Sequence, residues 1–252
     1  MGSGSQSHFP SWKRLSAAME IRPQELHLVR FRLDRDASAR QRMMALLSDD
    51  ERERAARFRF PLHGDRFVVA RASLRLLLGG ALGESPDGLR FAYGSAGKPA
   101  LADAHGGLSF NLSHSDDAAL VALVLGTSVG VDIEAERESV DAFDLADRFF
   151  AAREAAALAT VPLAGRMAAF FRCWTRKEAF IKAIGEGLSA PLGDFEVSFA
   201  DEREPPRLLR VAWAPDEVDR FTLLDVPAYP GFAGAVAVRA IGVSARFWDA
   251  AD

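Results

Sequence analysis

The chain has 252 residues, a length that suits one large domain or two small ones with a substantial hydrophobic core. Its 31 basic and 35 acidic residues give a net charge of −4, so overall charge does not indicate a nucleic-acid partner. The single cysteine, Cys173, excludes an internal disulfide, and no apolar run reaches the roughly 20 residues of a membrane span. We therefore expect a cytoplasmic protein that binds neither nucleic acid nor membranes.

The N-terminal half is expected to begin with a flexible segment over residues 1–8, which are rich in glycine and serine and lack a secretory signal. Alternating apolar residues predict a strand over 26–33. Helical periodicity predicts helices over 36–58, with a break where Ser48 can N-cap a second helix, and over 65–83. Two glycines and a proline predict a loop over 93–101. The candidate core residues are Leu26, Leu28, Phe31, Leu33, Phe67, Leu74, Leu77 and Leu78.

The rest of the chain alternates between strands and helices. Strands are predicted over 108–115, 118–126 and 128–134, the last two as a hairpin through Gly126, and helices over 143–159 and 166–187. Four further β-rich segments lie between 195 and 240. This order predicts an α+β chain of two similar, pseudo-twofold lobes, 9–126 and 127–252. No sequence repeat links the two lobes.

The stretch GVDIE (130–134) contains two carboxylates on one face of a predicted strand. Strand alternation places Asp132 and Glu134 together and Val131 and Ile133 on the opposite face. Neighbouring carboxylates repel each other unless water or a cation such as Mg²⁺ separates them. By itself, this pattern is most simply a solvent-facing strand end.

The helix over 166–187 carries a stripe of Trp174, Glu178 and Lys182, spaced four residues apart. An exposed Glu–Lys pair contributes only about 0.3–0.5 kcal/mol and is common on solvated helix faces. Trp174 is expected to be partly buried, which favours an interface for the stripe. The sequence gives no role to Lys177.

Three segments could bind an anion. Lys98 lies in GKP (97–99), and Ser113 and His114 lie in NLSHS (111–115). A lone histidine is more often structural, and a run of charges is usually a solvated face, but clustered arginines can also hold a phosphate-rich ligand. These arginines are Arg52, Arg54, Arg57, Arg59, Arg66, Arg71 and Arg75.

Taken together, these motifs resemble the 4′-phosphopantetheinyl transferases of the long, surfactin-synthetase-activating (Sfp) type. The resemblance covers most of the chain and implies two similar α+β lobes with coenzyme A in the cleft between them. It also implies a reaction, in which the phosphopantetheine arm of coenzyme A moves to a carrier-protein serine and adenosine 3′,5′-bisphosphate is released. The motifs are RFRFP (57–61), GKP (97–99), FNLSHS (110–115), VGVDIE (129–134), DRFFAAREA (147–155) and FFRCWTRKEAFIKAIGEGLSAPL (170–192).

The resemblance also implies roles for individual residues. Asp132, Glu134 and Glu178 would hold Mg²⁺ against the pyrophosphate, and the catalytic residues would be Asp132, Glu178 and Lys182. Glu178, or a water beside it, would accept the serine proton, and Lys182 would contact a phosphate oxygen. The implied coenzyme A contacts are Arg54, Arg71, Lys98, Pro99, Ser113, His114 and Lys182, with Arg75 as an alternative to Arg71.

The implied partner is an acidic, helical acyl or peptidyl carrier protein, and a monomer is expected because one chain already supplies both lobes. Docking is expected near 143–160, where Phe149 and Phe150 are available, although core packing is the simpler interpretation of both. Two other functions stay open from the residues alone. One is a different Mg²⁺-dependent phosphoryl-transfer or phosphodiester-cleaving enzyme, and the other is a non-catalytic protein that binds coenzyme A or the carrier.

Overall fold

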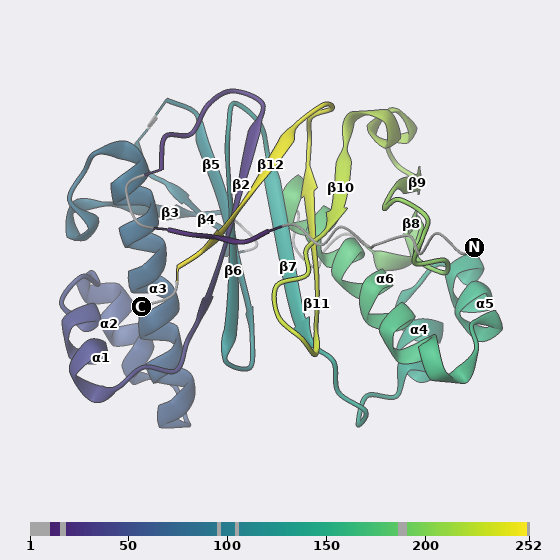
Figure 1. Cartoon of the computed structure of the whole chain (residues 1–252), viewed down its shortest axis with the longest axis horizontal. Coiled ribbons are helices and arrows are strands. Elements are labelled where there is room, and N and C mark those ends of the chain that lie inside the picture. Colours follow the sequence, from purple (N-terminus) through teal and green to yellow (C-terminus); the bar gives the residue numbers. More distant parts are fainter. Residues whose placement is uncertain (1–10, 16–18, 95–96, 104–105, 186–190, 251–252) are drawn as a thin grey trace, which may run out of the picture.

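Two β-sheets lie side by side in the middle of the molecule, and helices cover their outer faces (Figure 1). The computed structural model describes residues 11–15, 19–94, 97–103, 106–185 and 191–250, so the expected lead-in over 1–8 lies outside the described residues. The first sheet has the order β1 (Lys13–Arg14), β12 (Ser244–Asp249), β2 (Glu25–Arg32), β6 (Ala118–Leu125) and β5 (Leu108–Ser115). The second has the order β10 (Thr222–Asp225), β11 (Phe232–Val238) and β7 (Val129–Ala135). The fold is therefore α+β, as the sequence predicted.

Each sheet has its own group of helices and a small hairpin. The first group is α1 (Ala37–Met44), α2 (Asp49–Ala56) and α3 (Pro61–Leu82), with the hairpin β3 (Phe91–Tyr93) and β4 (Pro99–Leu101). The second group is α4 (Ala142–Phe149), α5 (Ala152–Thr160) and α6 (Leu163–Ile184), with the pair β8 (Phe195–Val197) and β9 (Leu208–Val211). We call each sheet with its helices the first and the second lobe. Of the helices described, none combines the length and apolarity that a bilayer crossing requires.

Hydrophobic clusters fill the spaces between the layers. One lies between α3 and the first sheet, and another lies between α6 and the second sheet. A third joins the sheets face to face through β2 and β6 on one side and β7 and β11 on the other. The predicted core residues are confirmed, since all are buried: Leu26, Leu28, Phe31, Leu33, Phe67, Leu74, Leu77 and Leu78.

The two sheets repeat one arrangement of strands. In the first lobe β6 pairs antiparallel with β2 and β5, and in the second lobe β11 pairs antiparallel with β7 and β10. The chain passes from one sheet to the other after residue 125, next to the proposed division between 126 and 127. The final strand, β12, nevertheless returns to the first sheet and lies parallel to β1 and β2. Residues 244–249 therefore complete the first lobe.

Some sequence-based predictions of local structure were wrong. The strands β6 and β7 do not form a hairpin, because they belong to different sheets, and Gly126 adopts a left-handed conformation (φ +73°) where the chain changes sheet. The predicted loop over 93–101 has paired strands at its ends, with residues 95–96 outside the described part. The single helix predicted over 143–159 is two helices, separated at Phe150–Ala151. Neither β1 nor β12 was predicted.

Candidate functional site

The strands β5 and β7 meet along a seam where the two sheets adjoin, and side chains rather than a backbone ladder connect them. The side chains come from every second residue of β5, so they all lie on one face of that strand. Asn111 Oδ1 accepts a hydrogen bond from the Val131 amide at 2.8 Å. Ser113 Oγ donates to Asp132 Oδ1 at 2.9 Å, and Ser115 Oγ donates to Glu134 Oε2 at 2.8 Å. We call this contact the β5–β7 seam.

Gly130 lets helix α6 pack directly against the same strand. A Cβ atom at this position would lie 2.2 Å from the carbonyl oxygen of Ala179 and 2.3 Å from the amide nitrogen of Ala183. Only glycine permits so close an approach of two backbones. As a result, Lys182 Nζ reaches Asp132 Oδ1 at 2.6 Å and Ser113 Oγ at 3.1 Å.

Three carboxylates gather at this crossing. Asp132 is only 2% exposed, so the interpretation of GVDIE as a solvent-facing strand end is wrong. Burial raises the pKa of Glu178, and the charge of Asp132 raises it further. Burial and Asp132 also raise the pKa of Glu134, while the hydrogen bond from Ser115 opposes that shift. The carboxylates therefore destabilise one another's ionised forms.

Two carboxylate oxygens in this group, Asp132 Oδ2 and Glu178 Oε1, are buried without a hydrogen-bond partner. A buried carboxylate oxygen without a donor is unfavourable, and hard divalent cations such as Mg²⁺ prefer oxygens of this kind. The donor chemistry therefore fits such an ion. Within the described ranges, however, no three His, Cys, Asp or Glu side chains are already arranged as a metal site. Lys182 is the cation that Asp132 contacts in this structure.

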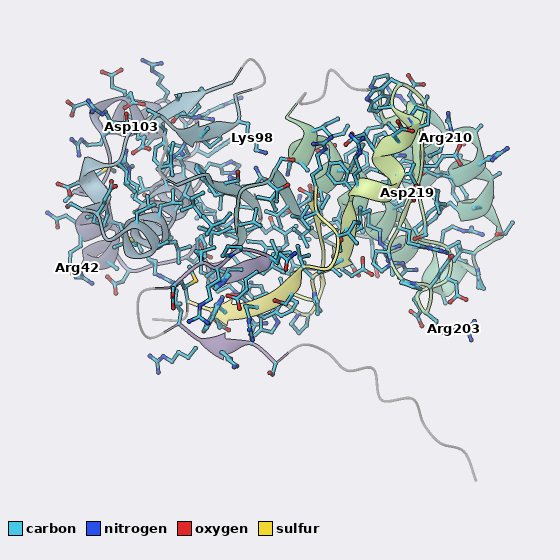
Figure 2. The ribbon with its side chains drawn as sticks, turned by 90° about the horizontal axis from the view of Figure 1, so that it is seen from above. Arg42, Lys98, Asp103, Arg203, Arg210 and Asp219 are labelled. Carbon is cyan, nitrogen blue, oxygen red and sulfur yellow. The ribbon has the colours of Figure 1, made fainter. Side chains whose placement is uncertain are left out.

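Lys98 joins the first lobe to this crossing. Its ammonium group donates to the carbonyl oxygens of Val129 at 2.9 Å and Lys182 at 2.5 Å. Burial, with a smaller contribution from the charge of Lys182, lowers the pKa of Lys98 to about 8. Figure 2 shows Lys98 on the side of the first lobe that faces the second. The neighbouring Pro99 begins β4.

The other predicted coenzyme A contacts lie apart from the carboxylates. His114 points to the opposite face of β5 from Ser113 and is exposed. Protein atoms nevertheless crowd its ring: desolvation lowers the pKa of His114, and the neighbouring Lys182, Arg66 and His63 lower it further. Arg54 is exposed, with its guanidinium carbon 5.2 Å from the centre of the Phe67 ring.

Arg71 is buried within the first lobe. Its Nε lies 3.3 Å from Glu51 Oε1, and its Nη2 donates to the Tyr93 hydroxyl at 3.1 Å. The structure thus brings together some of the predicted site residues and leaves Arg54 and Arg71 elsewhere. The residues brought together are Lys98, Ser113, Asp132, Glu134, Glu178 and Lys182.

Comparison with known sequences assigns the family. The profile of the 4′-phosphopantetheinyl transferase superfamily matches residues 128–225, which include β7 and α6. The chain is 39% identical to the 4′-phosphopantetheinyl transferase HetI of Nostoc sp. over 94% of this chain and 98% of that protein. The chain belongs to the 4′-phosphopantetheinyl transferase superfamily. It is therefore an enzyme of the transferase class.

Two further comparisons involve more distant proteins. The transferase is 31% identical to the 4′-phosphopantetheinyl transferase Sfp of Bacillus subtilis, over 62% of this chain and 68% of that protein. The holo-[acyl-carrier-protein] synthase structure from Thermotoga maritima aligns with 45% of this chain and 62% of its own, at 24% identity and a TM-score of 0.34. The second alignment is too weak to compare the two folds.

Lys177, which had no role from the sequence, has a structural role in the transferase. It is fully buried, and its Nζ donates to Glu154 Oε2 and to the Phe195 carbonyl oxygen, both at 2.6 Å. Glu154 also accepts from the amides of Ala151 and Val197. A signal existed in the sequence, because a glutamate three residues after a helix start often caps the first turn.

Residues of the seam that sequence reasoning missed include Asn111, Ser115 and Gly130. For Asn111 and Ser115 the signal was the alternation in FNLSHS, where polar side chains at 111, 113 and 115 share one strand face. Trp174 was predicted correctly to be partly buried, and it packs against the rings of Phe149 and Phe170.

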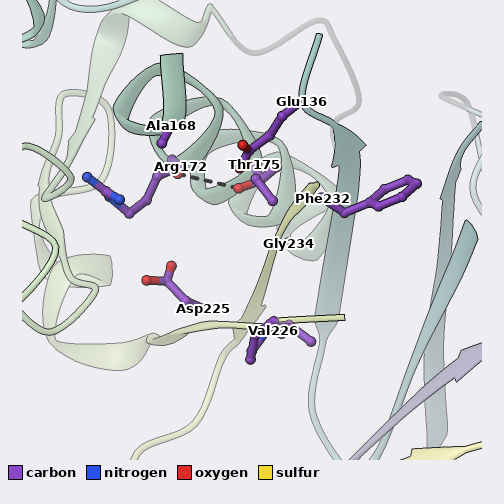
Figure 3. A pocket seen from close by; sticks show the side chains of 10 residues that line it. Glu136, Ala168, Arg172, Thr175, Asp225, Val226, Phe232 and Gly234 are labelled. Carbon is purple, nitrogen blue, oxygen red and sulfur yellow. Dashed lines mark hydrogen bonds between the residues drawn. The ribbon is translucent and has the colours of Figure 1, made fainter. Parts of the chain in front are cut away.

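A cavity of about 160 Å³ lies between α6 and the strands β10 and β11. Figure 3 shows Glu136 and Thr175 toward one side of it and Asp225 toward the other, with the Thr175 hydroxyl bonded to the Arg172 carbonyl. Bidentate hydrogen bonds from Arg176 hold Asp225. None of the predicted site residues lines this cavity.

Proposed function

We propose that the transferase moves the 4′-phosphopantetheine arm of coenzyme A to a serine of an acyl or peptidyl carrier protein and releases adenosine 3′,5′-bisphosphate. One observation carries the proposal beyond the family assignment. Asp132 Oδ2 and Glu178 Oε1 are buried without donors beside the ammonium group of Lys182. An arrangement of anions and a cation at the junction of two sheets suits a ligand that combines a metal ion with a pyrophosphate. The proposed site lies between the first lobe, which is residues 9–126 completed by β12, and the second lobe, which is formed by the rest of residues 127–252.

Asp132, Glu134 and Glu178 are the residues that would hold Mg²⁺. When bound, this ion supplies positive charge that neutralises the pyrophosphate oxygens during phosphoryl transfer. The unsatisfied oxygens of Asp132 and Glu178 support the assignment, because an ionised carboxylate buried without donors needs a cation or a proton.

Two side chains act on the substrates directly in this proposal. Lys182 is held at the site by Asp132 and Ser113, and its ammonium group binds a phosphate oxygen as a point charge. Glu178 accepts the proton of the attacking serine hydroxyl. Without a bound cation, burial and the charge of Asp132 raise the pKa of Glu178, so this carboxylate favours binding either a cation or a proton.

Coenzyme A is proposed to bind along the face of β5 and the adjoining basic residues. Arg66 lies close enough to His114 to lower its pKa, so a phosphate beside His114 would meet the permanent charge of Arg66 and an imidazole that can donate a hydrogen bond while neutral. Lys98 and Ser113 are already hydrogen-bonded to protein atoms, so a contact with coenzyme A would add to these bonds or exchange with them. The full proposed set is Arg54, Arg71, Lys98, Pro99, Ser113, His114 and Lys182.

The carrier protein is proposed to dock on the segment 143–160. Phe143 and Phe149 are 41% and 39% exposed on α4, while Phe150 is buried against Phe170. Core packing therefore explains Phe150, and Phe149 stays available for docking. The exposed Arg148 and Arg153 add positive charge that complements an acidic partner. We also propose that the transferase is cytoplasmic and monomeric.

Mass spectrometry of intact carrier proteins tests the proposal. The transferase is incubated with coenzyme A, Mg²⁺ and each member of a panel of apo carrier proteins from fatty-acid, polyketide and nonribosomal-peptide synthesis. At least one carrier should gain the mass of phosphopantetheine, and omission of the metal should prevent this. A panel in which no carrier changes mass, with folded transferase and folded carriers, would overturn the proposal. The variant Asp132→Asn serves as the inactive control.

A further inference from the structure

Each of two serines on β5 binds one oxygen of one carboxylate on β7. Ser113 bonds Asp132 Oδ1 and leaves Asp132 Oδ2 without a donor. Ser115 bonds Glu134 Oε2 in the same way, one strand repeat further along. The spacing of the serines therefore matches the spacing of the carboxylates across the β5–β7 seam.

We infer that Ser115 is a positioning residue of the proposed cation site, which holds Glu134 in the orientation that binds the ion. This inference rests on the proposed function, because it assigns Glu134 to the metal. It differs from a contact with coenzyme A, since the Ser115 hydroxyl is directed at a protein carboxylate and at a backbone amide.

The hydrogen-bond geometry of Ser115 fixes the direction of its single proton. Its Oγ accepts from the Ala135 amide at 3.1 Å, so that interaction uses an acceptor site and leaves the hydroxyl proton free. The carboxylate oxygen Glu134 Oε2, 2.8 Å away, can only accept, so the proton points to it. The backbone of β7 thus positions Ser115, and Ser115 positions the side chain of Glu134.

Glu134 needs such a partner because Asp132 repels it. Asp132 and Glu134 lie two residues apart on the same face of β7, and like charges placed in this way repel each other. Without this bond, the flexible glutamate would turn away from Asp132 toward solvent. Hydrogen bonds that orient metal ligands typically change metal affinity by about tenfold to a hundredfold when they are removed.

One residue of the β5–β7 seam can serve as a control, because it helps to hold the two sheets together without orienting a carboxylate. Asn111 Oδ1 likewise accepts from a β7 amide, that of Val131, but among the residues that the structure describes its side chain donates to no carboxylate. Removing its side chain weakens the seam and leaves the bond between Ser115 and Glu134 in place. Ser109 offers a second comparison, because it is partly buried on the same face of the same strand, next to neither Asp132 nor Glu134.

The experiment measures Mn²⁺ binding in the presence of coenzyme A, from the electron paramagnetic resonance signal of free Mn²⁺, together with a thermal melt of each variant. Ser115→Ala should weaken Mn²⁺ binding roughly tenfold to a hundredfold. Ser115→Thr keeps the hydroxyl group and should bind within about threefold of the wild type. Asn111→Ala should lower the melting temperature with little change in Mn²⁺ affinity, and Ser109→Ala should change neither.

Two results would overturn the inference alone: equal Mn²⁺ affinities in Ser115→Ala and Ser109→Ala, or equal losses in Ser115→Ala and Asn111→Ala. A failure of the proposed metal site looks different, because the wild type and Asp132→Asn would then bind Mn²⁺ equally, or neither would bind it. That outcome removes the assignment of Glu134 to the metal and the inference with it. Loss in Ser115→Ala with recovery in Ser115→Thr supports both.

Discussion

The two long helices, α3 in the first lobe and α6 in the second, share their dimensions and differ in their exposed side chains. Each has 22 residues, and each ends at a glycine in the left-handed conformation, Gly83 and Gly185. The first residues of the two helices, Pro61 and Leu163, are 102 positions apart, and so are the two glycines. The helices can therefore be compared position by position.

A buried ion pair occurs at the same place in both lobes. Arg75 and Lys177 are equivalent positions in the two helices, 102 residues apart, and each bonds the third residue of the preceding short helix, Glu51 or Glu154. Each cation also donates to a backbone carbonyl just after a 3₁₀ turn, that of Leu89 or Phe195. The repeat thus preserves polar contacts inside the lobes.

The residues of α6 that take part in the proposed chemistry have no counterparts of the same type in α3. The positions equivalent to Glu178 and Lys182 in α3 are Leu76, which is 46% exposed, and Gly80. The first lobe therefore has the same long helix packed on a sheet, but its helix lacks counterparts of Glu178 and Lys182. The helix-on-sheet packing therefore does not depend on the residues of the proposed site. Mutations at equivalent positions of α3 and α6 can test this.

The largest expected effect follows from replacing Glu178 on α6. Glu178→Gln should reduce the rate of carrier modification roughly a thousandfold or more, because it removes both a proposed metal ligand and the base. Leu76→Gln, at the equivalent position of α3, should change the rate less than about twofold. Mass-spectrometric rates for the two variants decide this, and a Glu178→Gln variant that works at the wild-type rate would contradict the proposed site.

The next effect concerns the repeated ion pairs. Lys177→Met should lower the free energy of unfolding by about 3–5 kcal/mol, because Glu154 then stays buried without a cation. Arg75→Met should lower it less, since Arg71 remains 3.3 Å from Glu51. Urea denaturation measures both values. Equal losses, or a larger loss in Arg75→Met, would show that the second arginine does not compensate.

The close packing of α6 on β7 predicts the third effect. Gly130→Ala places a methyl group within 2.3 Å of the α6 backbone, which should lower the free energy of unfolding by about 3 kcal/mol and displace Lys182 from Asp132. Gly165→Ala is the matched control, because its Cβ would meet only a Val161 methyl group at 3.8 Å. The control should be stabilised by about 0.5–1 kcal/mol through helix propensity. Thermal melts of both variants check these opposite signs.

The smallest effect is a dependence of stability on pH. Because the pKa of Glu178 is raised in the folded state, the folded protein binds its proton more tightly than the unfolded chain does, and stability falls as pH rises above about 4.5. Glu178→Gln removes this penalty and should be more stable than the wild type at pH 7 in metal-free buffer. The difference should shrink as the pH is lowered toward 4.5. A constant difference across this range in urea titrations would contradict the raised pKa.

The sequence predicted those parts of the fold that depend on local patterns. The strand at 26–33, the nearly all-apolar strand at 118–126 and the helix carrying Trp174 each had a clear periodicity, and each is present. The pairing of strands was harder to predict, because it joins residues far apart in the chain. Nothing local in Ser244–Asp249 indicates that its neighbour is a strand more than 200 residues earlier.

The candidate site was predicted to a similar degree. The resemblance of its motifs to the transferase family implied a site with Asp132, Glu178 and Lys182, which the structure brings together, whereas their residue types and spacing alone favoured solvated surfaces. The sequence could not show that Arg71 is buried beside Glu51, since a run of arginines looks the same whether it faces solvent or a buried acid. Nor could it show that Ser115 faces Glu134, because that contact joins two separate sheets.

The position of β12 affects the order in which the protein can be made. While the chain is being synthesised, β2 has an open edge until residues 244–249 leave the ribosome, so the lobe whose helices are translated first is the last to be completed. A chain cut after residue 243 would retain every proposed site residue and still expose that edge, which is prone to pair with other chains. Residues 244–249 therefore cover the edge of β2 that could otherwise pair with another chain.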